Sequence, residues 1–453
     1  MQRPGMIGGN LRAFWRDRTG YLTRQAELGD VSFIKMGPQP VFFINHPDLV
    51  RDVLVVNAHK FIKGRALQRS RVLLGNGLLT NEGADHLRQR RMIQPAFHRA
   101  RIAEYARSMV IYADQMADSW HDGDVRDIDQ EMMHLTLQIV GKTLFNADVG
   151  NDADRIGKAM TTMVELFNFL LLPFSEWLEK LPFPQSIRFK RARRTLDEIV
   201  YGIINERRRS GEDRGDLLSM LLLAQDEDDG STMTDEQVRD EALTLFLAGH
   251  ETTANALTWT WYLLSQNPKS EEKLHKELDA ALGSGGNGAA PIAASGENHP
   301  VGETPPPLLR KEGSLRHRVP TMDDIPNLKY TESVLAESMR LYPPAWAIGR
   351  NVVETHEFNG FTAAPGTLIL SSPFVMHRDA RFWDDPLAFN PERWESQSVK
   401  EAGQRNIYFP FGGGIRRCIG ESLRGPKASC CSRHSPANGN LAWLPTSVLT
   451  SNR

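Results

Sequence analysis

The chain has 453 residues, of which 24% are charged and 40% are hydrophobic, and its formal net charge at pH 7 is −2. This balance argues against a nucleic-acid-binding protein, because cationic runs such as residues 207–209 are matched by nearby acids. Three cysteines are too few for a disulfide framework. Residues 1–30 contain no apolar run long enough for a signal peptide or a membrane anchor, so we expect a soluble cytoplasmic protein.

Strand patterns are short and few. Residues 31–46 predict an early β-hairpin, and residues 366–372 predict a later strand. Helical periodicity is far more extensive, since apolar residues recur at three- and four-residue spacing over residues 101–120, 128–145, 191–210 and 234–268. The sequence therefore predicts a mainly α protein with a small β region.

The stretch from Gly283 to Pro320 interrupts these patterns. It is rich in glycine and proline and shows no hydrophobic periodicity. Such a composition cannot bury enough apolar surface to offset the entropy of ordering. We expect a disordered surface insertion.

The helix at residues 234–268 carries the first chemical signal. Thr234 and Gln237 form a predicted capping box, and the Asn267–Pro268 pair ends the helix, which gives it more than thirty residues. Its middle reads AGHETT, where glycine disfavours the helix and a threonine hydroxyl can bond back to the preceding turn. Two interpretations remain: a tolerated imperfection with a solvated Glu251, or a local opening that holds an acid and a hydroxyl beside an oxygen-containing ligand.

Three further motifs follow in one direction along the chain. Glu337 and Arg340 form an E-x-x-R pair, which is by itself typical of an ordinary helix surface. The sequence FNPERW then contains Arg393, and FPFGGGIRRCIG contains Cys418 among glycines. Cys418 has no second cysteine or histidine at zinc-site spacing, so it is either a small buried apolar residue or a lone thiolate ligand.

In this order the motifs resemble those of the cytochrome P-450 family of haem-thiolate monooxygenases. The cysteine loop matches the family pattern completely, and the resemblance extends from about Tyr21 to Gly420. It implies a single large helical haem-binding domain over residues 1–420, with residues 283–320 as the insertion. It also implies haem b (iron protoporphyrin IX) as the cofactor and Cys418 as the axial ligand of the iron, because a thiolate favours O–O cleavage.

The resemblance also assigns the other site residues. Thr252 hydrogen-bonds the dioxygen or its neighbouring water, and Glu251 relays protons, so both are candidate catalytic residues. Glu337, Arg340 and Arg393 form a structural network that holds the cysteine loop. The expected haem contacts, which include side chains beside the sulfur, over the iron and at the propionates, are Phe411, Gly414, Arg416, Gly420, His86, Arg90, Arg350, Ala248 and Gly249.

Electrons have to come from a separate protein, because the sequence contains no flavin- or nicotinamide-binding fingerprint. The resemblance implies NAD(P)H as their source and a ferredoxin or flavodoxin-like partner as their carrier. Arg88, Arg91 and Arg417 are candidates for a basic docking patch, with plain solvation as the alternative. Besides O2, the expected substrate is a lipophilic molecule, and candidate pocket segments are residues 66–80, 165–178 and 345–348.

Two other functions compete with a monooxygenase. One is a haem-binding protein without turnover, such as a sensor or a decayed relative, and the other is an enzyme that uses peroxide or rearranges an oxygenated lipid. The adjacent Glu251 and Thr252 favour the monooxygenase, since a sensor needs no proton relay. The tail, residues 421–453, departs from the family. Gly425 and Pro426 predict an early helix stop, and we expect a poorly ordered segment, produced by truncation or a shifted reading frame, that weakens haem binding.

Overall fold

The computed structural model describes residues 10–121, 123–146, 153–170, 183–226, 228–283 and 320–423. The predicted insertion, apart from its ends, and the predicted tail, apart from residues 421–423, lie outside these residues. The helices of the described part, apart from short 3-10 and π turns, are α1 (Leu11–Arg16), α2 (Arg18–Ala26), α3 (Pro47–Arg51), α4 (Arg65–Arg69), α5 (Arg71–Leu74), α6 (Gly83–Ile93), α7 (Arg99–Asp118), α8 (Ile128–Phe145), α9 (Ala153–Leu170), α11 (Pro184–Ser210), α12 (Leu217–Leu223), α13 (Asp235–Gln266), α14 (Pro268–Leu282), α15 (Lys329–Leu341), α16 (Pro373–Met376), α17 (Arg393–Ser396) and α18 (Val399–Gln404).

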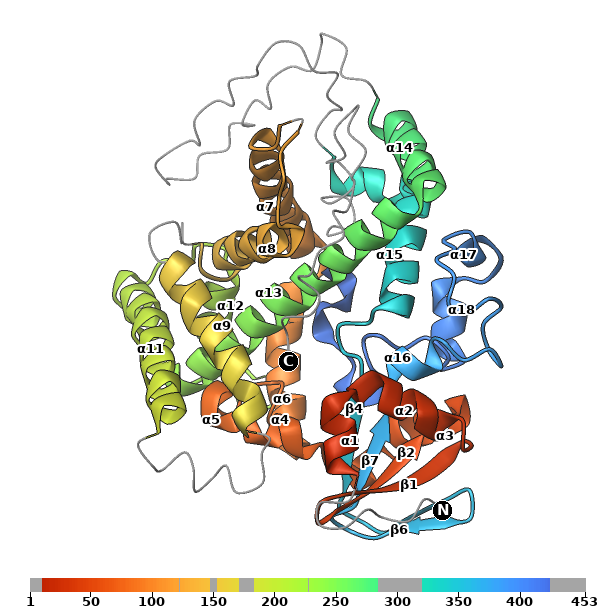
Figure 1. The fold of residues 1–453 in the computed structure, drawn as a ribbon. Helices are drawn as coiled ribbons and strands as arrows, with labels where there is room; N and C mark the ends of the chain where they lie inside the picture. Colours follow the sequence, from red (N-terminus) through yellow and green to blue (C-terminus); the bar gives the residue numbers. More distant parts are fainter. Residues whose placement is uncertain are drawn as a thin grey trace.

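A small β region accompanies the helices, so the mainly α fold with a small β component is confirmed (Figure 1). A five-stranded sheet has the order β1-β2-β7-β4-β3, and a separate hairpin pairs β5 with β6. The strands are β1 (Val31–Met36), β2 (Gln39–Ile44), β3 (Phe61–Lys63), β4 (Ile348–Val352), β5 (His356–Phe358), β6 (Phe361–Ala363) and β7 (Leu368–Ser371).

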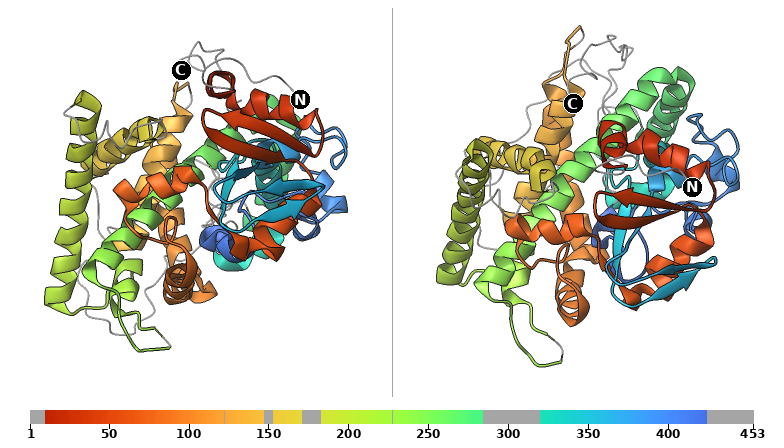
Figure 2. Two further views of the ribbon diagram at one scale, coloured as in Figure 1. Left: turned by 90° about the horizontal axis from the view of Figure 1, so that it is seen from below. Right: turned by 60° about the horizontal axis from the view of Figure 1, so that its bottom comes forward.

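The sheet joins the first and last parts of the described chain. The predicted hairpin is confirmed as β1 and β2, and the predicted later strand is confirmed as β7. β2 pairs with β7 in parallel, with Phe43 opposite Leu370. Figure 2 shows these early and late strands side by side. Strands β3 to β6 were not predicted, because no clear alternation of apolar and polar residues marks these short segments.

Helix α13 is the central helix of the molecule (Figure 1). The predicted capping box is confirmed, since the Thr234 hydroxyl accepts from the Gln237 N–H and the Gln237 side chain accepts from the Thr234 N–H. The helix runs for 32 residues and ends at Gln266, as predicted. Every residue from Val238 to Phe246 is buried, which is typical of a helix packed on all sides.

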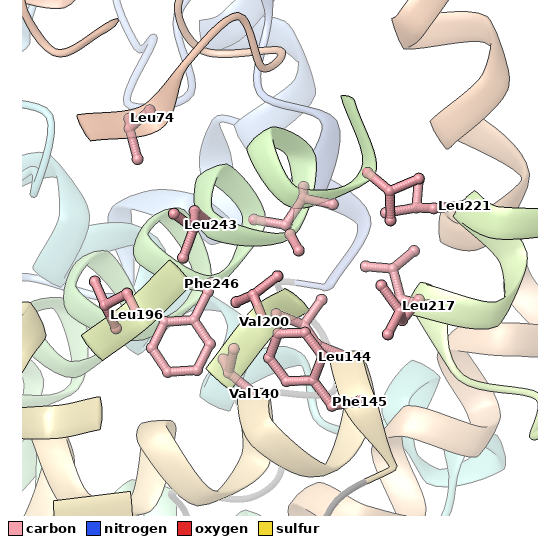
Figure 3. Close-up of a cluster of buried hydrophobic side chains, with 14 of the residues drawn as sticks. Leu74, Val140, Leu144, Phe145, Leu196, Val200, Leu217, Leu221, Leu243 and Phe246 are labelled. Atoms are coloured by element: carbon pink, nitrogen blue, oxygen red, sulfur yellow. The ribbon is translucent and has the colours of Figure 1, made fainter. Parts of the chain in front are cut away.

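The largest apolar cluster surrounds the first half of α13. Side chains from α8, α11 and α12 converge on it, as Figure 3 shows. The labelled members are Leu74, Val140, Leu144, Phe145, Leu196, Val200, Leu217, Leu221, Leu243 and Phe246. Burial of each such side chain stabilises the fold by about 1.5–3 kcal/mol. This cluster therefore fixes the position of α13 and of the functional groups further along the helix.

Candidate functional site

The cysteine loop follows α18 and packs on the early part of the chain. The Cys418 N–H donates to the Phe411 carbonyl at 2.9 Å, and Cys418 itself is exposed. Gly414 has a φ of 65°, and a Cβ there would lie 2.0 Å from the carbonyl oxygen of Leu54. Only glycine fits that position, because both the left-handed conformation and the close backbone contact exclude a side chain. The loop is thus rigidly seated with its thiol residue at the surface.

A second exposed surface lies on α13. Between Val238 and Leu264, a stretch that the structure describes in full, Ala248 and Thr252 are the two exposed residues. They are one turn apart and therefore lie on one face of the helix. The Thr252 hydroxyl donates to the Ala248 carbonyl at 2.5 Å, which is the back-bonding that the sequence indicated.

The same apolar cluster contacts both surfaces. Leu247, next to Ala248, and Ile419, next to Cys418, each pack against it. Glu251 is half-buried, and this burial raises the pKa of its carboxyl group. A raised pKa allows the acid to hold and release a proton nearer to neutral pH than a solvated glutamate. The exposed thiol, the hydroxyl and this acid are the chemically active groups of the region.

Gly249 was expected to lie over the haem iron, but it packs against a neighbouring helix. A Cβ at this position would lie 3.1 Å from Cγ2 of Val140 on α8. His250, the next residue, is buried and its Nε2 is 3.0 Å from the Met133 carbonyl oxygen, also on α8. Close packing between two helices therefore explains the glycine, and of the pair Ala248 and Gly249 it is Ala248 that is exposed.

Cationic groups gather near the cysteine loop. Lys63 on β3 is paired in register with Arg350 on β4, and both are buried. His86 on α6 is buried as well, and its burial together with the charges of these two residues, Arg90 and Arg416 lowers its pKa to about 4. Burial lowers the pKa of Lys63 to about 7 and that of Arg350 to about 10. Burial and the neighbouring cations therefore disfavour the positively charged forms of these side chains.

This cluster fits a cofactor with an anionic edge, such as the two propionates of haem. The described acid closest to Arg416 is Glu82, whose carboxylate accepts from Arg416 Nη2 at 2.8 Å. The guanidinium of Arg350 donates to the Gly349 carbonyl at 3.0 Å. Burial disfavours the charged forms of Lys63 and Arg350, and carboxylates beside these side chains would favour their charged forms. Arg90 donates to the Arg417 carbonyl at 2.7 Å, which connects α6 with the cysteine loop.

The E-x-x-R pair is fully buried rather than a helix-surface pair. Arg340 donates to both oxygens of Glu337 at 2.9 Å, and Arg393 Nε donates to Glu337 Oε1 at 2.9 Å. The Trp394 indole and the Asn390 backbone N–H each add a bond of 3.0 Å to the same carboxylate. The structure therefore brings the three residues that the resemblance grouped into one network.

His377, which sequence reasoning missed, joins this network to the cysteine loop. Its carbonyl accepts from Arg340 Nη1 at 2.6 Å, and its Nε2 accepts from the Phe409 N–H at 3.0 Å. Burial lowers the pKa of this histidine well below its usual value, so the ring is neutral and can accept. Lys63 and Glu82 were also missed, because nothing local marks a single charged residue at the end of a short strand or in a loop as buried or half-buried.

The candidate docking arginines bind acids of the chain. Arg88 lies 3.2 Å from Asp226, Arg91 lies 2.5 Å from Asp228, and Arg417 lies 2.5 Å from Glu421. These ion pairs reduce the positive charge available to a partner. The arrangement favours the alternative of ordinary solvated and structural pairs over a basic docking patch.

The candidate pocket segments are only partly described. Residues 66–80 form most of α4, all of α5 and the loop that follows, whereas residues 345–348 lead into β4. The side chains of residues 165–178 lie outside the described part. Among the helices that the structure describes, none is long and apolar enough to span a membrane.

Loss of the buried Glu337 charge should destabilise the fold. We expect Glu337→Gln to lower the free energy of unfolding by about 3–5 kcal/mol, because the buried Arg340 and the half-buried Arg393 lose their counter-charge. Chemical denaturation measures this. Glu332→Gln, at an exposed position of the same helix, should change it by less than about 0.5 kcal/mol. Equal effects of the two substitutions would contradict a special role for the buried carboxylate.

Glu241 on α13 should give the protein a characteristic dependence on pH. It is fully buried, and burial raises its pKa to about 8. The unfolded chain releases this proton near pH 4.5 and the folded chain near pH 8, so its stabilising contribution is complete below pH 4.5 and decreases as pH rises. From pH 5 to 7 we expect Glu241→Gln to gain stability relative to the unchanged protein, by up to about 1.4 kcal/mol per pH unit.

The range from pH 5 to 7 separates the effect of Glu241 from that of Lys63. The lowered pKa of Lys63, about 7, makes the free energy of unfolding rise with pH above pH 7. Urea denaturation of the unchanged protein and of Glu241→Gln at pH 5, 6 and 7 measures the difference between their free energies of unfolding. Parallel stability curves over this range would show that Glu241 is ionised throughout.

Comparisons with known proteins agree with the geometry. The model of the Cytochrome P450 family matches residues 12–292 and 311–424, and the interval between them falls within the predicted insertion. Cyclooctatin synthase of Streptomyces melanosporofaciens is 38% identical over 418 residues, which cover 92% of this chain and 83% of that protein. Cyclooctat-9-en-7-ol 5-monooxygenase of the same organism is 36% identical, covering 93% and 84%. Pentalenene oxygenase of Streptomyces avermitilis is 34% identical, covering 88% and 82%.

Proposed function

The chain belongs to the cytochrome P450 family, and from this premise we propose that it is a haem-thiolate monooxygenase that inserts one oxygen atom of O2 into a cyclic terpenoid. The observation that carries the proposal is the pair of exposed surfaces, Cys418 in a rigid loop and Ala248 with Thr252 on an otherwise buried helix. Both border the same apolar cluster. The names of the relatives support the substrate class.

Haem, when bound, supplies the iron at which dioxygen is activated. Cys418 would supply a thiolate ligand to this iron, and His86, Arg90, Arg350 and Arg416 would hold the propionates. We propose residues 1–420 as the haem-binding domain, with residues 283–320 as an insertion. The family model matches residues 12–292 and 311–424.

Thr252 and Glu251 deliver protons. The Thr252 hydroxyl donates to the Ala248 carbonyl, which leaves its oxygen free to accept a hydrogen bond from a water molecule on the exposed side. Glu251, whose pKa is raised by burial, holds a proton and passes it toward this water. An acid and a hydroxyl on consecutive residues of one helix thus form a short relay, which distinguishes this site from one that only binds haem.

A separate ferredoxin or flavodoxin-like protein supplies the electrons, with NAD(P)H as their source. The ion pairs of Arg88, Arg91 and Arg417 with acids of the chain do not support these arginines as its docking surface. That the tail, residues 421–453, weakens haem binding also stays a prediction.

The thiolate assignment is tested by the absorption of the reduced protein with CO. We expect the red-shifted band that is typical of thiolate ligation, and we expect Cys418→Ala to abolish it, since the sulfur is the ligand. The Cys430→Ala, Cys431→Ala double variant should retain the band. A band that persists in Cys418→Ala would refute the assignment.

The proton relay is tested by coupling, the amount of product formed per NAD(P)H consumed. Thr252→Ala should leave haem binding intact but lower coupling about tenfold or more and release peroxide, because the hydroxyl acts only in oxygen activation. Thr258→Ala, on the same helix but not on the Ala248 face, should keep normal coupling. Unchanged coupling in Thr252→Ala would remove this residue from the relay.

The substrate class is tested by binding. Pentalenene and cyclooctat-9-en-7-ol should each change the haem absorption spectrum of the loaded protein at micromolar concentration, whereas palmitate should not. Spectral shifts with palmitate but with neither terpenoid would contradict the proposed class.

A further inference from the structure

The loop between α5 and α6 is fastened to α13 by two consecutive acids. The backbone N–H of Asn76 donates to Asp240 Oδ2 at 2.6 Å, and that of Leu78 donates to Glu241 Oε2 at 3.0 Å. Asp240 is 4% exposed and Glu241 is 0% exposed. Burying carboxyl groups costs free energy unless they are hydrogen-bonded, so these contacts are specific attachments rather than chance surface pairs.

Two glycines allow the loop to approach the helix. Gly75 has a φ of 59°, and a Cβ there would lie 2.0 Å from Asp240 Oδ2. A Cβ on Gly77 would lie 2.3 Å from Thr244 Oγ1 and 2.7 Å from the Asp240 carbonyl oxygen. Any side chain at either position would push the loop away. The backbone of residues 75–78 therefore lies directly on α13.

Other buried side chains also bind the backbone of this loop. Lys63 Nζ donates to the carbonyl oxygens of Leu78 at 2.8 Å and Asn81 at 2.6 Å. With its amide nitrogen turned toward α13, Gln89 donates to Glu241 Oε1 at 2.6 Å and to the Asn76 carbonyl at 3.2 Å. Backbone donors and acceptors of this loop are thus bound to buried side chains from β3, α6 and α13.

The attachment lies next to the proposed substrate site. Thr244, Ala248 and Thr252 are spaced by four residues and share one face of α13. Gly77 contacts Thr244, so the loop is located one turn along the helix from the exposed Ala248. Leu78 and Leu79 of the loop belong to or pack against the apolar cluster that Leu247 also contacts.

We propose that Asp240 and Glu241 are positioning residues that hold residues 75–80 as one wall of the substrate site and so determine which molecules fit. The inference rests on the proposed function, because it assigns the wall of that site. Neither acid reaches a reacting atom. Each acts by fixing the loop backbone, so its loss should alter the size selectivity of the site more than its capacity to bind a small ligand.

The first measurement is hydrogen–deuterium exchange of the holoprotein over residues 71–81. Glu241→Leu and Asp240→Leu keep the approximate volume but remove the acceptors, and we expect amide exchange at residues 76 and 78 to accelerate about tenfold or more. Glu241→Gln and Asp240→Asn each retain one acceptor oxygen for these backbone N–H groups and should exchange more slowly than the Leu variants. Leu278→Ala, in the buried cluster of α14, controls for general loss of stability.

The second measurement compares two haem ligands of different size, imidazole and 4-phenylimidazole, by absorption titration. The Leu variants should change the ratio of the two dissociation constants at least fivefold, while the amide variants and Leu278→Ala should keep it. Gly77→Ala, which displaces the loop without changing a charge, should change the ratio in the same way and serves if a Leu variant fails to fold.

Unchanged exchange in the Leu variants would overturn the attachment. Faster exchange with an unchanged ligand ratio in the Leu and Gly77→Ala proteins would overturn the assignment as a wall of the site. Failure of the proposed function is distinguishable, because a protein without the thiolate CO band still reports the exchange of residues 71–81.

Discussion

The buried carboxylate of Glu337 is the constraint on which the site depends. A charge with no exposure to water is stable only when donors surround it, and here Arg340, Arg393, Trp394 and the Asn390 backbone supply them. Arg340 also donates to the carbonyl oxygens of His377, Pro386 and Ala388. His377 Nε2 in turn accepts from the Phe409 N–H, which connects the network to the start of the cysteine loop. One ion network therefore fixes the loop that presents Cys418.

Around the site, desolvation acts in opposite senses on acids and bases. Burial raises the pKa of Glu241 and Glu251 and lowers those of Lys63, His86 and Arg350. Each shift moves the group toward its neutral form. Burying so many ionisable groups costs folding free energy that a purely structural core would not require. An anionic cofactor beside the cations would offset part of that free energy.

The AGHETT segment shows how one helix serves packing and chemistry at once. Gly249 and His250 face α8, where Val140 and the Met133 carbonyl contact them. Ala248 and Thr252 face the opposite, exposed side. Because helical residues four apart share a face, the motif is divided between a structural and a functional surface without interrupting the helix.

The sequence by itself determined α7, α8, α13 and most of α11, the capping box of α13, the β1–β2 hairpin and the order of motifs, because each depends on neighbours within a few residues. It also grouped Glu337, Arg340 and Arg393 through the family resemblance. Only the tertiary structure decided that Lys63 and Glu241 are buried, that Gly249 packs on α8, and that Arg88 and Arg91 meet acids more than 130 residues away. Burial and ion pairing depend on contacts between distant segments, and no local pattern records which segments will meet.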